Sequence, residues 1–361
     1  MTRKNKLEVI LRARDIKPAS DSLVRQLGQL ASSHEKEQGA ASQLLLYCKT
    51  RNGSPGDRVY DKLLEEQRRK KEMVDDQIKT IIGKSSTLRQ QVHVALYERR
   101  GRERALTLET LGGLRNEETG ISSFRQLMGD LYEHLLSDIY FNYSLTMGIT
   151  HTPVTEPRRQ VVVNHHYTPH DWSKTVVCAL LRAALLPSLV VGGGIQEEIG
   201  TTPSYALFRV SRSHDTVENL RFLLDPSRTY YDPEELHGKD LIFPDPMLAT
   251  GGSLIAVYNL LRNKGVKPAS ITVVSAVSAM KGVLNVVRNI PGVRIYTAAI
   301  DPALNDKGYI LPGLGDAGDR LNGSENSHGK ERGVIELIQN YEEVYQTRYA
   351  LEIKAIRKIV T

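Results

Sequence analysis

The segment 245–253, Asp-Pro-Met-Leu-Ala-Thr-Gly-Gly-Ser, constrains the fold of this chain more than any other segment. A short apolar run at 241–243 precedes it, and a helical pattern begins at its last residue, Ser253. Because Gly251 and Gly252 allow a tight turn, backbone N–H groups can converge there on an anion at the N-terminus of the helix. No Gly-Lys-Ser/Thr follows, so the segment is not a Walker-type nucleotide loop. It predicts a phosphate-binding turn between a strand and a helix.

The polar side chains of this segment extend the prediction from phosphate to a sugar phosphate. Thr250 and Ser253 add hydroxyl donors for the same anion. Asp245 stands at the carboxyl end of the predicted strand, where open α/β sheets bind their ligands. Its carboxylate can accept hydrogen bonds from two ribose hydroxyls and would favour positive charge that develops on the sugar. We therefore expect a site for ribose 5-phosphate.

The rest of the chain predicts an α/β protein with a parallel sheet. From about residue 160, short apolar runs alternate with helical patterns, an arrangement typical of parallel sheets. We expect a helix at 121–141 and, towards the N-terminus, a charged helical region whose apolar residues from Val59 to Ile82 recur every three or four positions. A further helix is expected at 331–346. The expected strands are 161–163, 175–181, 205–208, 241–243, 271–274 and 294–296, and the helices between them are 253–264 and 279–289.

The segment 245–253 closely resembles the ribose-phosphate motif of the uracil phosphoribosyltransferase family. The resemblance continues at 295–301, 304–305 and 308–320, which is similar to the family's uracil-binding segment, and more weakly at 111–127. It covers about residues 92–323. It implies a type I phosphoribosyltransferase fold, a central and mostly parallel sheet flanked by helices, in a domain at 91–323. Residues 1–90 would then form a basic helical extension, and 324–361 a helical C-terminal extension.

The resemblance also implies a reaction and its residues: transfer of ribose 5-phosphate from 5-phosphoribosyl pyrophosphate (PRPP) to uracil, giving UMP and pyrophosphate, with Mg²⁺ bound alongside PRPP. The implied catalytic residues are Asp245, Arg182, Arg209 and Asp316. The implied PRPP-binding residues are Asp245, Met247, Ala249, Thr250, Gly251, Gly252 and Ser253. The implied uracil-binding residues are Tyr296, Ile310, Gly315, Asp316 and Ala317.

Main-chain recognition of uracil agrees with the composition of the loop 308–320. Uracil offers two carbonyl acceptors and an N–H donor, which a rigid loop rich in glycine and proline can satisfy with backbone atoms.

Two departures from the family pattern affect the chemistry. The pyrophosphate loop of the family reads Leu-Arg-Ala-Gly, whereas this chain has alanine at position 184. If that glycine adopts a positive φ, an alanine costs on the order of 1 kcal/mol or more. The second departure is the segment 210–215, which replaces a loop that folds over the substrate in the family. Arg212 and His214 could still grip pyrophosphate there, or the segment is a solvated loop with incidental charges.

The positive charge lies in the N-terminal quarter. Residues 1–90 hold 19 lysines and arginines against 12 aspartates and glutamates, while the whole chain has 48 against 42. Such a segment favours an anionic partner such as nucleic acid, or it is a solvated helical face. This leaves an alternative function, a repurposed effector that binds PRPP or a nucleotide, for example in a bacterial anti-phage system such as a retron.

The remaining features carry weaker expectations. No apolar run is long enough to span a bilayer, and none follows Met1, so we expect a cytoplasmic protein without a membrane partner. Cys48 and Cys178 are expected to be free thiols. The cluster of His165, His166 and His170 lacks a further ligand at metal spacing, so no protein-bound metal is expected. The family resemblance implies a homo-oligomer, a dimer or larger.

Overall fold

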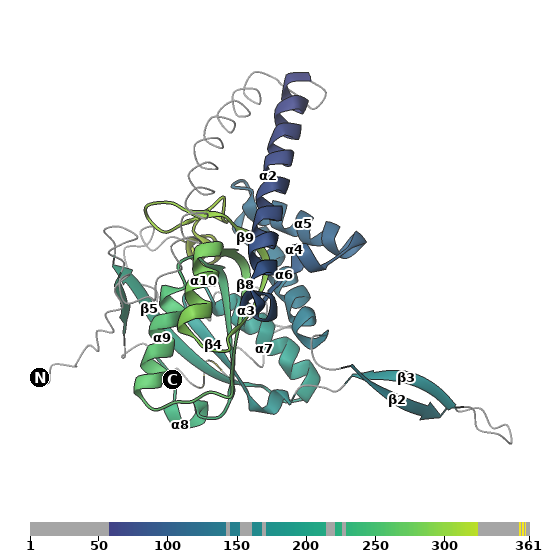
Figure 1. Cartoon of the computed structure of the whole chain (residues 1–361). Coiled ribbons are helices and arrows are strands. Elements are labelled where there is room, and N and C mark those ends of the chain that lie inside the picture. The colour runs from purple at the N-terminus through teal and green to yellow at the C-terminus, as the bar shows by residue number, and fades with distance from the viewer. Residues whose placement is uncertain are drawn as a thin grey trace, which may run out of the picture.

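A seven-stranded sheet forms the centre of the computed structural model, which describes residues 58–141, 145–151, 161–167, 171–213, 221–225 and 229–323, with 354, 356 and 358 (Figure 1). The strand order is β1-β9-β8-β7-β4-β5-β6, and every neighbouring pair is parallel except β5 and β6. The strands are β1 (Val92–Val94), β4 (Thr175–Leu181), β5 (Ser204–Ser213), β6 (Arg221–Leu224), β7 (Asp240–Leu248), β8 (Ser270–Ala279) and β9 (Arg294–Asp301). The predicted mostly parallel α/β sheet is confirmed.

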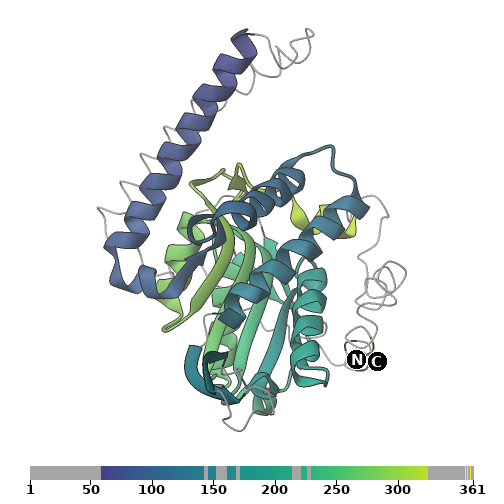
Figure 2. The ribbon, with the colours of Figure 1, turned by 90° about the vertical axis from the view of Figure 1, so that its right-hand side faces the viewer.

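Helices cover both faces of this sheet. On one face α6 (Ile121–Phe141) packs beside α7 (Leu185–Ile199), and on the other α9 (Gly252–Asn263) packs beside α10 (Met280–Asn289) (Figures 1 and 2). The central strands β4, β8 and β9 are almost wholly buried, as expected when helices exclude water from both faces. The domain also contains the helices α3 (Ser86–Gln91), α4 (Ala95–Glu98), α5 (Gly101–Arg115), α8 (Pro233–Leu236) and α11 (Ala317–Asn322) and the 3₁₀ turn η2 (Trp172–Lys174).

One predicted strand belongs to a different sheet. The run 161–163 lies in β3 (Val161–Tyr167), which pairs antiparallel with β2 (Leu145–His151) in a separate hairpin. This hairpin extends away from the domain (Figure 1). An apolar run predicts extended backbone but not the strand with which it pairs, so our expectation of a place in the parallel sheet was wrong for 161–163. The other strand and helix predictions within the described residues are confirmed, while the helix expected at 331–346 lies outside them.

The helix α2 (Arg58–Lys84) confirms the helical period seen before residue 90. Near its C-terminal end Ile78 and Ile82 are buried in the main core, whereas the N-terminal part projects from the domain (Figure 1). The segment Arg58–Lys84 has eight basic and six acidic side chains. Basic and acidic side chains three or four positions apart form ion pairs along the helix. These pairs are Arg68–Glu65, Arg68–Glu72, Arg69–Glu65, Lys70–Glu66, Lys71–Asp75 and Lys79–Asp76. Much of the positive charge of α2 is thus matched within the helix.

Cys178 is a free, buried thiol in β4, as expected. Burial raises the pKa of this thiol, so it stays protonated at neutral pH. Cys48 lies outside the described residues. Among the helices of the described residues, none combines the length and apolarity needed to cross a membrane.

Arg99 ties α4, α5 and α6 together. Its guanidinium donates to both carboxylate oxygens of Asp138, at 3.3 and 2.7 Å, and to the hydroxyl of Thr107 at 2.9 Å. The Arg99 side chain is only 9% exposed. Burial raises the pKa of Asp138, although Arg99 opposes this effect. Loss of Arg99 would leave a poorly solvated carboxylate without its main counter-charge, which is more damaging than loss of an exposed pair.

We therefore expect Arg99→Ala to lower the free energy of unfolding by about 2–3 kcal/mol. Urea denaturation checks this value. Arg100→Ala is the matched control, because Arg100 is exposed and, among the residues that the structure describes, donates to the carbonyls of Tyr97 and Arg99 rather than to a carboxylate. Equal loss of stability in the two variants would contradict the interpretation.

Candidate functional site

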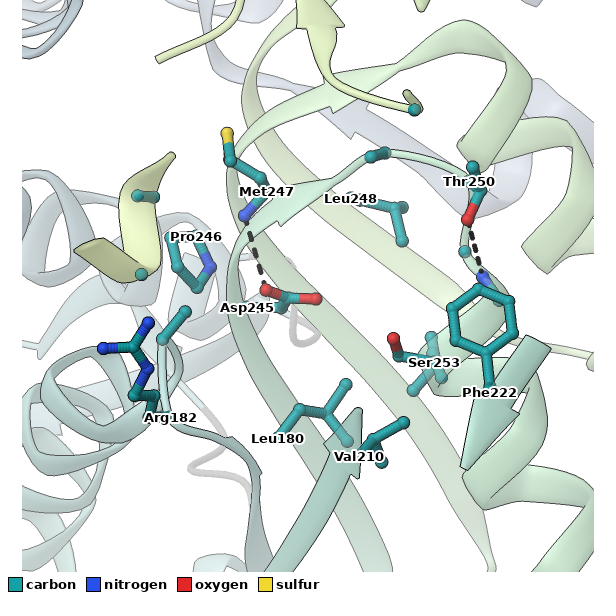
Figure 3. Close-up of a pocket in the computed structure, with 18 of the residues that line it drawn as sticks. Leu180, Arg182, Val210, Phe222, Asp245, Pro246, Met247, Leu248, Thr250 and Ser253 are labelled. Carbon is teal, nitrogen blue, oxygen red and sulfur yellow. Dashed lines mark hydrogen bonds between the residues drawn. The ribbon is translucent and has the colours of Figure 1, made fainter. Parts of the chain in front are cut away.

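A cavity of about 360 Å³ opens at the carboxyl ends of β4, β5 and β7 (Figure 3). This is the edge at which parallel α/β sheets bind ligands. Its walls come from segments that are far apart in the sequence: residues 180–183, 209–211, Phe222, 245–254, 308–310 and 316–318.

The turn between β7 and α9 forms one wall. Gly251 is the N-cap of α9 and has φ = +74°, a conformation that favours glycine. A Cβ atom on Gly251 would lie 2.6 Å from a methyl group of Val286, and one on Gly252 would lie 2.1 Å from the ring of Phe222. The Thr250 hydroxyl accepts a hydrogen bond from Gly252 N at 3.3 Å (Figure 3). Neither glycine position has room for a side chain, and the turn presents the N-terminus of α9 to the cavity, an arrangement suited to an anion.

The helix α10 supports this turn from behind. A Cβ atom on Gly282 would lie 2.4 Å from the carbonyl oxygen of Ala249 and 2.6 Å from that of Leu248. The amide of Asn285 donates to the carbonyl of Thr250 at 3.0 Å. Because these contacts are to backbone atoms, the turn cannot accommodate a side chain at Gly282 by changing a rotamer.

Asp245 faces the cavity from β7 (Figure 3). Its Oδ1 accepts a hydrogen bond from Met247 N at 3.4 Å, and Met247 also lines the cavity. Behind this part of the sheet, Tyr132 donates to the carbonyl of Val274 at 3.1 Å. The pKa of Tyr132 is well above its usual value, chiefly because the hydroxyl is buried and then because the Asp245 carboxylate lies near it. The cavity thus has a carboxylate at its centre, held by a rigid strand.

Arg182 reaches the cavity from the loop after β4, but its guanidinium is engaged with α11. Nη2 donates to Asp319 Oδ1 at 2.6 Å, and Nη1 donates to the carbonyl of Gly323 at 2.8 Å. In Figure 3 the guanidinium of Arg182 lies at the edge of the cavity nearest α11. An anion that accepts hydrogen bonds from Arg182 would have to share the guanidinium with Asp319 and Gly323 or displace them.

The alanine at position 184 causes no backbone strain. Ala184 has φ = −78° and ψ = −2°, in the right-handed region open to any residue, and its side chain is completely buried. The expected cost of a positive φ therefore does not arise. Arg209 lines the cavity beside Val210 and Ser211. The side chain of Arg212, and His214, lie outside the described residues.

The loop after β9 forms the opposite wall, where Ile310, Asp316 and Ala317 line the cavity together with Tyr309. Asp316 Oδ1 accepts from Asp319 N at 3.0 Å and so caps α11, while Tyr309 donates to Asp316 Oδ2 at 3.3 Å. These bonds hold Asp316 between the loop and α11.

Two predicted uracil-binding residues are not among those that line the cavity. Tyr296 is near the amino end of β9, 2% exposed, and stacks on His93 with a centroid distance of 4.6 Å. Gly315, with φ = +70°, belongs to the predicted loop but is not one of the residues that line the cavity. All the other predicted catalytic and binding residues line the cavity.

Sequence reasoning missed Phe222, which closes the side of the phosphate turn. It lies on β6, the antiparallel edge strand, and is 3% exposed. No motif marks it, because its contact with Gly252 depends on the pairing of β6 with β5. Pro246 and Tyr309 were also missed, although both lie inside the segments that the family resemblance had singled out.

No group of three or more histidine, cysteine, aspartate or glutamate residues is arranged to hold a metal among the residues that the structure describes. The side chains of His165 and His166, and His170, lie outside that part of the chain. Asp245 and Asp316 supply hard oxygen donors on the cavity wall, so a magnesium ion carried by a phosphate ligand would meet suitable groups there.

Comparison with known proteins gives a consistent result. A family model described as uracil phosphoribosyltransferase matches residues 102–324. The uracil phosphoribosyltransferase of Agrobacterium fabrum is 34% identical over 226 residues, which is 62% of this chain and 97% of that protein. That of Dictyoglomus thermophilum is 35% identical over 221 residues, or 61% and 96%. A solved structure, the AQ2163 protein from Aquifex aeolicus, is 25% identical, with a TM-score of 0.45, and the match covers 60% of this chain and 94% of that one.

The contact between Gly282 and the phosphate turn generates a prediction. Gly282→Ala should push α10 and the turn apart and weaken the binding of PRPP by roughly tenfold or more, because small displacements of a binding loop are costly. Isothermal titration with PRPP measures the effect. Gly83→Ala is the control, since a Cβ atom there meets nothing within 4 Å. Unchanged affinity in a folded Gly282→Ala protein would contradict the prediction.

Proposed function

The chain belongs to the uracil phosphoribosyltransferase family, and on that basis we propose that it transfers ribose 5-phosphate from PRPP to uracil, giving UMP and pyrophosphate. One observation carries the proposal. The phosphate turn 249–253, Asp245 and the loop 308–317 surround the same cavity, although they come from different parts of the sequence.

The phosphate turn and Asp245 would hold the sugar phosphate. The 5′-phosphate sits at the N-terminus of α9, where the helix dipole and the hydroxyls of Thr250 and Ser253 favour an anion. Asp245 accepts hydrogen bonds from the ribose hydroxyls. As the bond from C1′ to pyrophosphate lengthens, positive charge grows on the ribose, and the carboxylates of Asp245 and Asp316 stabilise that charge.

Two arginines would stabilise the leaving pyrophosphate. Arg182 and Arg209 both line the cavity, and guanidinium groups suit phosphate oxygens because they donate in a planar fork. Pyrophosphate competes with Asp319 for Arg182. A magnesium ion bound with PRPP would neutralise further charge on the pyrophosphate, and Asp245 and Asp316 are the carboxylates available to it.

Uracil would lie against the loop after β9. Main-chain groups of Ile310, Asp316 and Ala317, which line the cavity, can pair with its carbonyls and its N3–H, so that N1 becomes nucleophilic without a strong base. N1 then attacks C1′, pyrophosphate leaves with its electron pair, and the N1 proton passes to solvent.

The alternative, a repurposed effector with weak or altered catalysis, had three motives in the sequence: the alanine at 184, the changed segment 210–215 and the basic extension. Ala184 adopts an ordinary helical conformation, and ion pairs engage much of the positive charge on α2. Ala184 therefore gives no support to the effector, and the ion pairs show that the described part of the extension is not a bare basic surface. A protein or nucleic-acid partner bound through residues 1–90, and assembly into a homo-oligomer, stay predictions.

Asp245→Asn tests the proposed reaction. The wild-type protein should form UMP from uracil and PRPP in a magnesium-dependent manner, and the variant should lose roughly 100-fold or more in kcat, since a neutral amide stabilises the ribose charge poorly. Chromatography of labelled uracil and UMP provides the measurement.

Asp130→Asn is the control, a carboxylate on α6 that does not line the cavity. A wild-type protein that binds PRPP and uracil but forms no UMP would refute the proposal.

A further inference from the structure

The end of α5 is joined to the loop after β9 by a buried ion pair. Arg115 Nη1 donates to Asp301 Oδ2 at 2.8 Å, and Nη2 donates to Asp301 Oδ1 at 2.8 Å. The side chains are 22% and 7% exposed. Neither residue lines the cavity. This two-pronged pairing fixes the distance and the orientation of its partners more strictly than a single contact would.

Both partners also bond to one glycine in the loop. Arg115 Nη1 donates to the carbonyl of Gly313 at 3.0 Å, and Gly313 N donates to Asp301 Oδ2 at 2.9 Å. The two backbone polar groups of Gly313 are therefore both bonded to the same ion pair. Any shift of this pair moves the loop directly.

Gly313 in turn fixes the position of Ile310. Gly313 has φ = +60°, and a Cβ atom on it would lie 2.2 Å from the carbonyl oxygen of Ile310. The turn 310–313 is thus closed tightly, with the carbonyl of Ile310 directly against Gly313. Ile310 lines the cavity where uracil is proposed to bind. A continuous chain of contacts runs from Arg115 through Gly313 to the wall of the base site.

A second arginine, Arg320 of α11, bonds to the next residue of the same loop. Arg320 donates to the carbonyls of Leu314, at 2.9 Å, and Leu114. It also donates to the carbonyl of Asn116 at 2.6 Å, and its guanidinium lies 4.0 Å from the centre of the Phe124 ring. The loop after β9 is consequently bonded at two successive residues, Gly313 and Leu314, to arginines that also contact the C-terminal end of α5 or belong to it.

We propose that Arg115, with Asp301, is a positioning residue for the nucleobase: it sets the main-chain groups of the loop at the spacing that uracil requires. This inference rests on the proposed function. Neither Arg115 nor Asp301 lines the cavity, and the phosphate turn and Asp245 belong to other segments of the wall. Asp316, the residue of this loop assigned to the ribose, is held by Asp319 N and the Tyr309 hydroxyl rather than by Arg115. Arg115 therefore acts on one substrate of the two.

A purely structural brace would have a different kinetic signature. Loss of a brace lowers the fraction of folded enzyme, which reduces kcat and leaves the KM of both substrates unchanged. Loss of a positioning residue misplaces the recognition groups, which raises the KM for uracil and leaves the KM for PRPP unchanged.

The experiment compares Arg115→Gln and Arg115→Lys with the wild-type chain in steady-state assays that vary each substrate separately. Arg115→Gln should raise the KM for uracil by roughly 10- to 100-fold and leave the KM for PRPP within about twofold. Arg115→Lys keeps the positive charge near Asp301, but an ammonium group cannot reproduce the paired bonds that a guanidinium makes to both carboxylate oxygens. Its KM for uracil should therefore lie between those of the wild type and Arg115→Gln.

Arg99→Ala is the matched control, because it also removes a buried arginine–carboxylate pair on this side of the domain but leaves the loop after β9 untouched. Its KM values should equal those of the wild type. If Arg115→Gln does not fold, the same KM measurements are made on Arg115→Lys and Asp301→Asn. For each variant, an increase in Tm on addition of PRPP shows that the protein is folded and that its phosphate site is intact.

Two failures are distinguishable. A wild-type chain that forms no UMP overturns the proposed function. A wild-type chain that forms UMP, with Arg115 variants whose KM for uracil is unchanged or rises in step with the KM for PRPP, overturns this inference alone.

Discussion

The close approach of the turn after β7 to α10 is the constraint on which the rest of the site depends. Gly251 adopts a positive φ, and Gly282 brings the helix against the carbonyls of Leu248 and Ala249. These contacts leave no room for side chains, so the backbone itself forms the wall of the cavity. An anion can then meet main-chain N–H groups and the helix dipole directly. Asp245 lies on β7, the strand that leads into this turn, so the strand that places the turn also places the carboxylate.

Arginine has three different uses around this cavity, and residue type alone does not separate them. Arg209 lines the cavity, and Arg182 lines it while bonded to Asp319. Arg115 and Arg320 stand behind the loop after β9 and bond to backbone carbonyls. Arg99, by contrast, does not line the cavity and pairs with Asp138 of α6. The use of each guanidinium is decided by the acceptor that the fold places before it.

The extension before the domain combines two kinds of contact. The C-terminal part of α2 contributes Ile78 and Ile82 to the main core, while the N-terminal part is a charged helix in which acidic and basic side chains pair along one segment. Such pairs are exposed and individually weak, so they keep the helix solvated rather than hold it to the domain. The last turns of α2 thus pack with the core of the domain, whereas the described side chains of its first turns do not contribute to that core.

The sequence by itself determined the strand, turn and helix around 245–253 and most other strands of the parallel sheet, because apolar periodicity and glycine pairs act within a few residues. The resemblance to a known family, which is also read from the sequence, added Arg182, Arg209 and the loop 308–320, so that half of the residues that line the cavity were predicted. Only the tertiary structure decided which strand 161–163 pairs with, that Tyr296 stacks on His93 away from the cavity, and that Phe222 closes the phosphate turn. The bonds from Arg115 to Asp301 and Gly313 join residues nearly 200 positions apart. Their partners are set by the order of strands in the sheet, which the pattern of any single segment does not contain.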